Sequence, residues 1–183
     1  MPYTFSPMKA VQATSILLKP SPDMTMSYMK LIKLLYIADR ESIKETRAPI
    51  TGDRPVAMPH GPVLSSIYDF IMKRDRPGIE TWEQFFETAG IDIVLLNEPG
   101  TDELCPYEVD KLREIAARYA DHTQWDLRDL THEFDEWKRN DPGHSSQAIP
   151  LEHIIDAVGL SNEIDEILQD REDSKYFASI FQR

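Results

Sequence analysis

The chain has 183 residues, a formal net charge of −12 at pH 7 and one cysteine. This length suits one folded domain, and a single cysteine forms no internal disulfide, so we expect residues 1–183 to be one domain in the cytoplasm. No stretch approaches the roughly 20 apolar residues that span a bilayer, which argues against a membrane protein. The negative charge argues against broad contact with nucleic acid, because binding to phosphates uses clustered Lys and Arg side chains.

The charge is distributed unevenly along the chain. Residues 1–74 carry ten Lys or Arg and six Asp or Glu, a balance of +4, whereas residues 75–183 carry ten and twenty-six, a balance of −16. This asymmetry favours interaction of the acidic part with a basic partner. An acidic surface that only aids solubility is the alternative that composition leaves open.

Two helices are predicted in the N-terminal third of the chain. Ser6-Pro7 is typical of a helix start, and the apolar spacing that follows continues until Pro20. Residues 25–46 predict a second helix that is apolar on most sides, which is typical of a helix in the centre of a fold. Its narrow polar stripe consists of Lys30, Lys33, Arg40 and Lys44.

The next segment is rich in proline and glycine. Residues 48–58 predict an irregular hairpin or loop, and Gly61 and Pro62 are interpreted as the N-cap and first residue of a third helix that ends near Arg74. The aromatic and β-branched segments 81–86 and 91–97 then predict a β-hairpin, with a helix over 81–88 as the alternative.

The rest of the chain is predicted to be mainly helical. Cys105 and Glu108 have the spacing of a capping box, with cysteine in the place of serine, ahead of an amphipathic helix over 109–119. A shorter helix is expected over 125–132, a loop over 134–148, and helices over 151–158 and from 161 onward. The predicted fold class is therefore mainly α with a small β element (α+β), a compact helical domain with a short β-hairpin or small antiparallel sheet.

No credible catalytic or metal site emerges from the residue pattern. His60, His122 and His132 are the candidate metal ligands, but the last two are ten residues apart, and no His-Glu-x-x-His or Cys-x-x-Cys motif is present. Cys105 stands at a helix start without an identifiable base. His60-Gly61-Pro62 is interpreted first as helix punctuation and second as a site for an anion or a partner's carboxylate. We predict no catalytic residue, no metal and no cofactor.

Four segments carry a family resemblance: LIKLLYIADR, ITGDRPVAMPHGPVLSSIYDF, DELCPYEVD and WDLRDLTHEFDEWKRN, in this order. Together they resemble the Panacea antitoxin domain, also called the Soc antitoxin-like or phage-associated domain, from about residue 6 to residue 170, with a helical tail to 183. The most specific pieces are Lys33 to Tyr36, Gly61-Pro62-Val63, and Thr131-His132 followed by Trp137. Cys105 departs from the serine usual in similar sequences.

The resemblance implies a mostly helical antidote in a bacterial or phage toxin–antitoxin pair, on a scaffold that is paired with many unrelated toxins and has no established catalytic residues. The expected partner is a cognate toxin from a neighbouring gene, basic and bound directly. An adaptor that delivers the toxin to a protease is the first alternative. A metal-dependent or cysteine hydrolase using His60, His132 or Cys105 is the second. The candidate partner-binding residues are Lys30, Lys33, His60, Gly61, Pro62, Thr131, His132 and Trp137, although Trp137 is also suited to pinning neighbouring helices.

Overall fold

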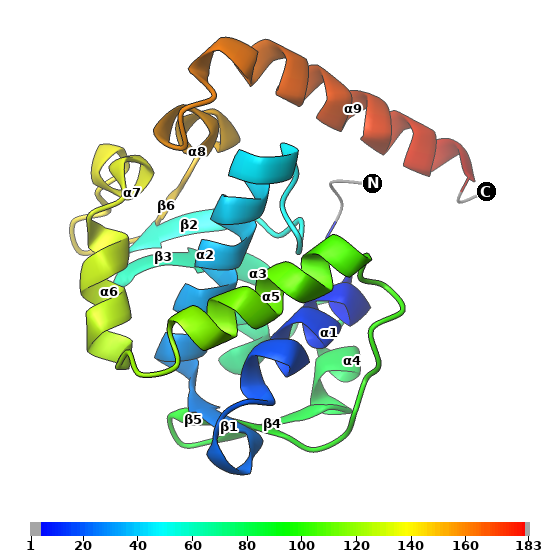
Figure 1. The fold of residues 1–183 in the computed structure, drawn as a ribbon, viewed down its shortest axis with the longest axis vertical. Coiled ribbons are helices and arrows are strands. Elements are labelled where there is room, and N and C mark those ends of the chain that lie inside the picture. Colours follow the sequence, from blue (N-terminus) through cyan, green and yellow to red (C-terminus); the bar gives the residue numbers. More distant parts are fainter. Residues whose placement is uncertain (1–4, 182–183) are drawn as a thin grey trace.

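The computed structural model describes residues 5–181, which form nine α-helices and two small antiparallel sheets of three strands each (Figure 1). The expected mainly helical α+β class is confirmed. Within the described residues, no helix combines the length and apolar character needed to cross a membrane.

The helices are α1 (Pro7–Leu18), α2 (Tyr28–Thr46), α3 (Ser65–Ile71), α4 (Ile79–Glu83), α5 (Pro106–Arg118), α6 (Gln124–His132), α7 (Asp135–Arg139), α8 (Leu151–Ala157) and α9 (Ile164–Phe181). Two 3-10 turns are η1 (Pro22–Met24) and η2 (Ser161–Glu163). The strands are β1 (Thr25–Ser27), β2 (Pro55–Met58), β3 (Gly61–Leu64), β4 (Phe86–Ala89), β5 (Asp92–Leu95) and β6 (Gln147–Ala148).

Helix α2 lies in the centre of the molecule, as its apolar character predicts (Figure 1). It contacts α1, α3, α5, α6 and α8 as well as β1 and β3. Eleven of its 19 residues are buried. The helix begins later than expected, because Thr25–Ser27 form strand β1 and the Ser27 hydroxyl accepts the Lys30 N–H as the N-cap.

The first sheet has the strand order β1-β5-β4, with all pairs antiparallel. Strands β4 and β5 form the predicted hairpin, and Gly90 in its turn has a φ of +66°. The helical alternative is also realised in part, because Ile79–Glu83 form α4 just before the hairpin. The aromatic segment is therefore divided between a short helix and a strand.

The second sheet, β3-β2-β6, corrects the interpretation of Gly61 and Pro62 as a helix start. Both residues belong to β3, where Gly61 pairs with Met58 and Pro62 with Ala57. Helix α3 begins at Ser65, and its first N–H groups are capped by Asp53 from a preceding loop. The Asp53 carboxylate accepts the N–H of Ser66 at 2.8 Å and that of Ile67 at 3.0 Å. Local capping patterns consider only the residues next to a helix start, so they cannot predict a cap that comes from a distant residue such as Asp53.

The segment predicted as a loop over 134–148 is also corrected, since it contains α7 and β6. Strand β6 pairs with β2, and α7 is held by tertiary contacts that are described below. The capping-box spacing before α5 is confirmed on its reciprocal side, because the Cys105 N–H donates to Glu108 Oε2 at 2.9 Å.

The two expected C-terminal helices are confirmed as α8 and α9. Helix α9 lies across one end of the molecule, over α8, as Figure 1 shows. It packs against α8 and η2, and Ile167 is the buried apolar residue among the α9 side chains that the structure describes.

Candidate partner-binding site

The three most specific sequence motifs, far apart in the chain, meet where α2, β3, α6 and α7 come together. Contacts join residues of all three motifs at this place. We call this cluster the motif junction, and it consists of Lys33, Tyr36, Gly61, Pro62, Thr131, His132, Glu136 and Trp137.

Lys33 is a buried cation at the centre of the motif junction. Lys33 is 2% exposed, and its ammonium donates a hydrogen bond to the Pro62 carbonyl at 2.8 Å. No carboxylate within residues 5–181 pairs with it, and burial without a counter-charge lowers the pKa of Lys33 to about 7. Near neutral pH this amine therefore exchanges between its charged and neutral forms.

Gly61 allows α2, β3 and α6 to approach closely. Its φ of +92° lies in the left-handed region, and a Cβ there would lie 2.8 Å from Lys33 Nζ and 2.8 Å from Thr131 Oγ1. It would also lie 3.2 Å from His132 Cδ2. Glycine is required here by backbone conformation and by space together.

His132 and Trp137 form the outer part of the motif junction. Their rings stack with centroids 4.1 Å apart and planes 13° apart, and the Trp137 indole N–H donates to the Met58 carbonyl at 3.1 Å. His132 Nε2 is buried and has no hydrogen-bond partner within the described residues. Burial lowers the pKa of His132, and the positive charge of Lys33 lowers it further.

A buried carboxylate holds the other side of the motif junction. Glu136 Oε1 accepts from the Tyr36 hydroxyl at 3.1 Å and from Arg40 Nε at 2.7 Å, and the Glu136 side chain is fully buried. Arg40 also stacks over the Phe134 ring at 4.2 Å. Burial, followed by the neighbouring charge of Glu136, raises the pKa of Tyr36 well above its ordinary value.

Glu136 is a residue that the sequence analysis missed. Apart from its place beside Trp137, nothing in the sequence distinguishes it from the other acidic residues of the loop predicted over 134–148. Its partners, Tyr36 and Arg40, lie about a hundred residues earlier in the chain. The available signal was the position of Glu136 directly before the motif residue Trp137.

The structure brings seven of the eight predicted binding residues together and places one elsewhere. His60 and Lys33 line a hollow of about 60 Å³ beside Gly61, together with Tyr28, Met58 and Tyr68. The side chain of Lys30 instead reaches the end of α5, where its ammonium donates to the Ala120 carbonyl at 2.8 Å.

The structure separates Cys105 from the two histidines. Cys105 lies at the start of α5, whereas His132 ends α6, and Figure 1 shows these two points beyond opposite ends of α5. Within the described part of the chain, no group of three or more His, Cys, Asp or Glu side chains could hold a metal ion.

A family model described as antitoxin SocA-like, Panacea domain, matches residues 31–138. The match covers more than half of the chain and contains the whole motif junction, although it is narrower than the resemblance from 6 to 170. No curated protein and no solved structure matches the chain. The chain belongs to the SocA-like antitoxin family with the Panacea domain.

Proposed function

We propose that this protein is a cytoplasmic antitoxin that binds a cognate toxin, encoded by a neighbouring gene, and neutralises it by covering its functional surface. The observation that carries the proposal is the family match over residues 31–138. The protein acts as a binding partner and transforms no substrate. The toxin it recognises is basic, which accords with the net charge of −12.

The predicted binding residues have two roles in this proposal. Lys33, Gly61, Pro62 and Thr131 are buried, so they act by holding β3 and α6 in position. His60 is exposed, whereas Lys30, His132 and Trp137 are partly exposed, so these four are available for direct contact with the toxin.

The acidic charge contributes chiefly to the rate and selectivity of binding. An electrostatic field that is complementary to a basic toxin accelerates encounter, and this acceleration weakens as salt screens the charges. The lasting affinity then comes from the packed part of the interface.

Coexpression with the product of the neighbouring gene tests the proposal. The neighbouring product alone should stop growth of a bacterial host, and coexpression of this chain should restore growth. The two proteins should also purify together as a complex. A neighbouring product that is harmless alone, or equally harmful with this chain, contradicts the proposal.

A protease-deficient host separates covering from delivery to a protease. Covering predicts that growth is still restored in this host and that the toxin is present in complex. Loss of the rescue, with accumulation of free active toxin, would indicate that this chain is an adaptor for degradation.

A further inference from the structure

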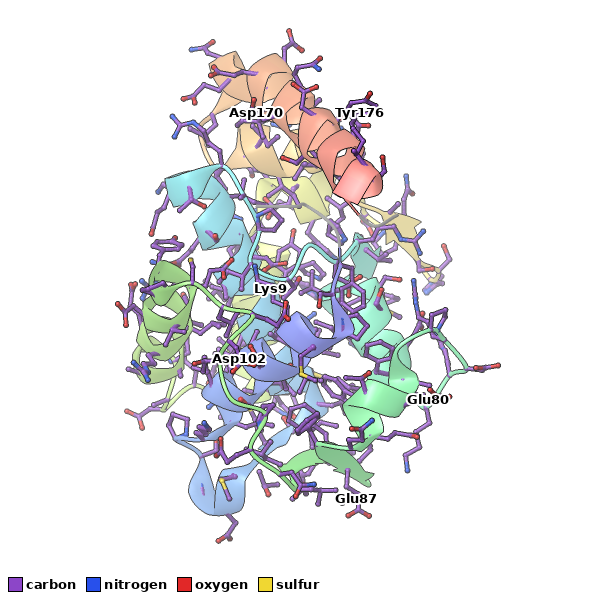
Figure 2. The ribbon with its side chains drawn as sticks, turned by 90° about the vertical axis from the view of Figure 1, so that its right-hand side faces the viewer. Lys9, Glu80, Glu87, Asp102, Asp170 and Tyr176 are labelled. Carbon is purple, nitrogen blue, oxygen red and sulfur yellow. The ribbon has the colours of Figure 1, made fainter. Side chains whose placement is uncertain are left out.

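One segment of the chain carries acidic residues and no basic ones. Residues 77–103 contain seven Asp or Glu and no Lys, Arg or His. These residues form α4, the hairpin β4–β5 and the loop before α5. Figure 2 shows Glu80, Glu87 and Asp102 on one face of the molecule. We call these residues the acidic strip: Glu80, Glu83, Glu87, Asp92, Glu98, Asp102 and Glu103.

The charge of the acidic strip is largely uncompensated. Within the described chain, Glu98 pairs with Lys19 at 2.5 Å, and the other six carboxylates form no ion pair. Carboxylates elsewhere in the structure do form ion pairs. Glu45 and Glu114, for example, both pair with Lys111, at 2.8 and 2.7 Å. Six carboxylates without an ion-pair partner on one segment create a negative potential that a cationic group would relieve.

Glu87 of the acidic strip lies on β4, which is an outer strand of its sheet. In the order β1-β5-β4, strand β4 has a neighbour on one side only among the described residues. The Leu96 N–H donates to the Phe85 carbonyl, so hydrogen-bonded pairs alternate from Phe85 through Glu87 to Ala89. The main-chain N–H and C=O groups of Phe86 and Thr88 therefore point away from β5. Phe86 is 3% exposed, whereas Thr88 is partly exposed, so Thr88 is the residue whose edge groups are open to a partner.

A hollow of about 220 Å³ lies beside this strand. Its apolar lining comes from Phe70, Trp82, Phe86 and Leu96, and Leu96 is 50% exposed. Glu83 and Glu87 supply acidic groups at the hollow, and Lys73 supplies a single basic one. The hollow thus offers an apolar surface with carboxylates next to unpaired backbone groups.

We propose that an extended segment of the toxin carrying lysine or arginine side chains docks along β4, pairs with its free edge and places its cations against the acidic strip. This inference rests on the proposed function and assigns it a surface. Addition of a strand uses backbone hydrogen bonds for affinity and side chains for selection.

Charge selects the occupant of this edge. A second copy of the chain would bring the same carboxylates against the acidic strip, and like charges on a sheet edge oppose such pairing. Nucleic acid is repelled for the same reason. A basic segment is attracted, so the charges that keep the edge free of self-association also favour this partner.

A pair of matched variants tests the surface in the full chain. The strip variant carries Glu80→Lys, Glu83→Lys and Glu87→Lys. The control carries Asp165→Lys, Glu166→Lys and Asp170→Lys, three exposed residues of α9, and changes the net charge by the same amount. Titration calorimetry with purified toxin should give a dissociation constant raised about tenfold or more by the strip variant. The control should stay within about threefold of the wild type.

Amide hydrogen exchange tests the strand pairing without any substitution. Adding toxin should slow exchange at Thr88, whose N–H group faces the free edge and whose residue is partly exposed. Exchange at the Glu87 N–H, which faces β5, should be slow before and after toxin is added.

The charge variants of the calorimetry experiment need a separate control for folding. Circular dichroism establishes that both variants are folded.

The outcomes separate the two proposals. Failure of the wild type to bind or neutralise the toxin contradicts the proposed function itself. Normal neutralisation by the wild type, with the strip variant binding as tightly as the control, overturns the inference alone. Equal weakening by both variants also overturns it, because the charge would then act through the overall field rather than at β4. Unchanged exchange at Thr88 overturns the strand pairing.

Discussion

The motif junction and the acidic strip place their charged groups in opposite settings. At the motif junction, Glu136 is fully buried and bonded to Tyr36 and Arg40, and Lys33 is enclosed against a backbone carbonyl. In the acidic strip, six carboxylates have no ion-pair partner within the described chain, and most of them are exposed. Packing and hydrogen bonds therefore fix the charged side chains of the motif junction, whereas most side chains of the acidic strip lie in solvent.

The motif junction holds the scaffold together, whereas the acidic strip belongs to the surface that we propose for recognising a partner. The residues that carry the family resemblance are largely buried, where volume, hydrogen bonding and backbone conformation leave few acceptable side chains. Exposed acidic residues can change with little effect on folding. Under the proposed function, a scaffold built in this way keeps its motif junction while its exposed surface is free to change with the partner.

The largest effect on stability is expected from Glu136→Ala in the motif junction. The substitution leaves the mostly buried guanidinium of Arg40 and the hydroxyl of Tyr36 without their acceptor. We expect a loss of about 3–5 kcal/mol in the free energy of unfolding, measured by urea denaturation. Glu98→Ala, which removes an exposed ion pair with Lys19 from the acidic strip, should cost less than about 1 kcal/mol. Similar costs for the two substitutions would remove the distinction between the regions.

Two glycines with positive φ allow the same comparison for the backbone. Gly61→Ala places a methyl group 2.8 Å from Lys33 Nζ and Thr131 Oγ1, whereas Gly90→Ala, in the β4–β5 turn between acidic-strip residues, has no heavy atom within 4 Å of the new Cβ. Gly90→Ala should cost about 1–2 kcal/mol from its backbone conformation alone. Gly61→Ala should cost about 1–3 kcal/mol more, because packed neighbours must move. Thermal unfolding of the two variants measures the difference, and equal melting temperatures would show that the junction is loosely packed.

The pH dependence of stability should report Lys33. Its pKa is about 7 in the folded chain against an ordinary value of 10.5, so between these values the unfolded chain binds more protons at this site. Stability should therefore rise from pH 7.5 to 9.5, by up to about 1.4 kcal/mol per pH unit. Lys33→Met should flatten this rise. An equally steep rise in Lys33→Met would show that other groups are responsible. The raised pKa of Asp39, about 7, acts on stability mainly below this window.

The smallest effect on stability is expected from the strip variant with Glu80→Lys, Glu83→Lys and Glu87→Lys. These exposed carboxylates form no ion pairs within the described residues, so the free energy of unfolding should change by less than about 0.5 kcal/mol per site. Urea denaturation beside the α9 control measures this change. A large loss of stability would mean that the acidic strip is structural, and any loss of toxin binding could not then be assigned to contact.

Much of the fold was predictable because its signals are local. The apolar character of residues 25–46 indicated a central helix, and aromatic and β-branched residues around Gly90 indicated a hairpin. The motif segments predicted the family. The misplaced elements depend on distant partners: Asp53 caps α3 from another loop, and α7 is anchored through Glu136. Local patterns hold no information about such partners.

The sequence by itself determined the helical class, the family and the strong acidity of residues 77–103, because periodicity, motifs and charge are properties of neighbouring residues. Only the tertiary structure decided that Lys33 is buried beside Gly61, that Glu136 joins α7 to α2, and that Glu83 and Glu87 lie beside an edge strand. The physical reason is that burial and pairing are set by residues far apart in the chain, which packing brings within a few ångströms.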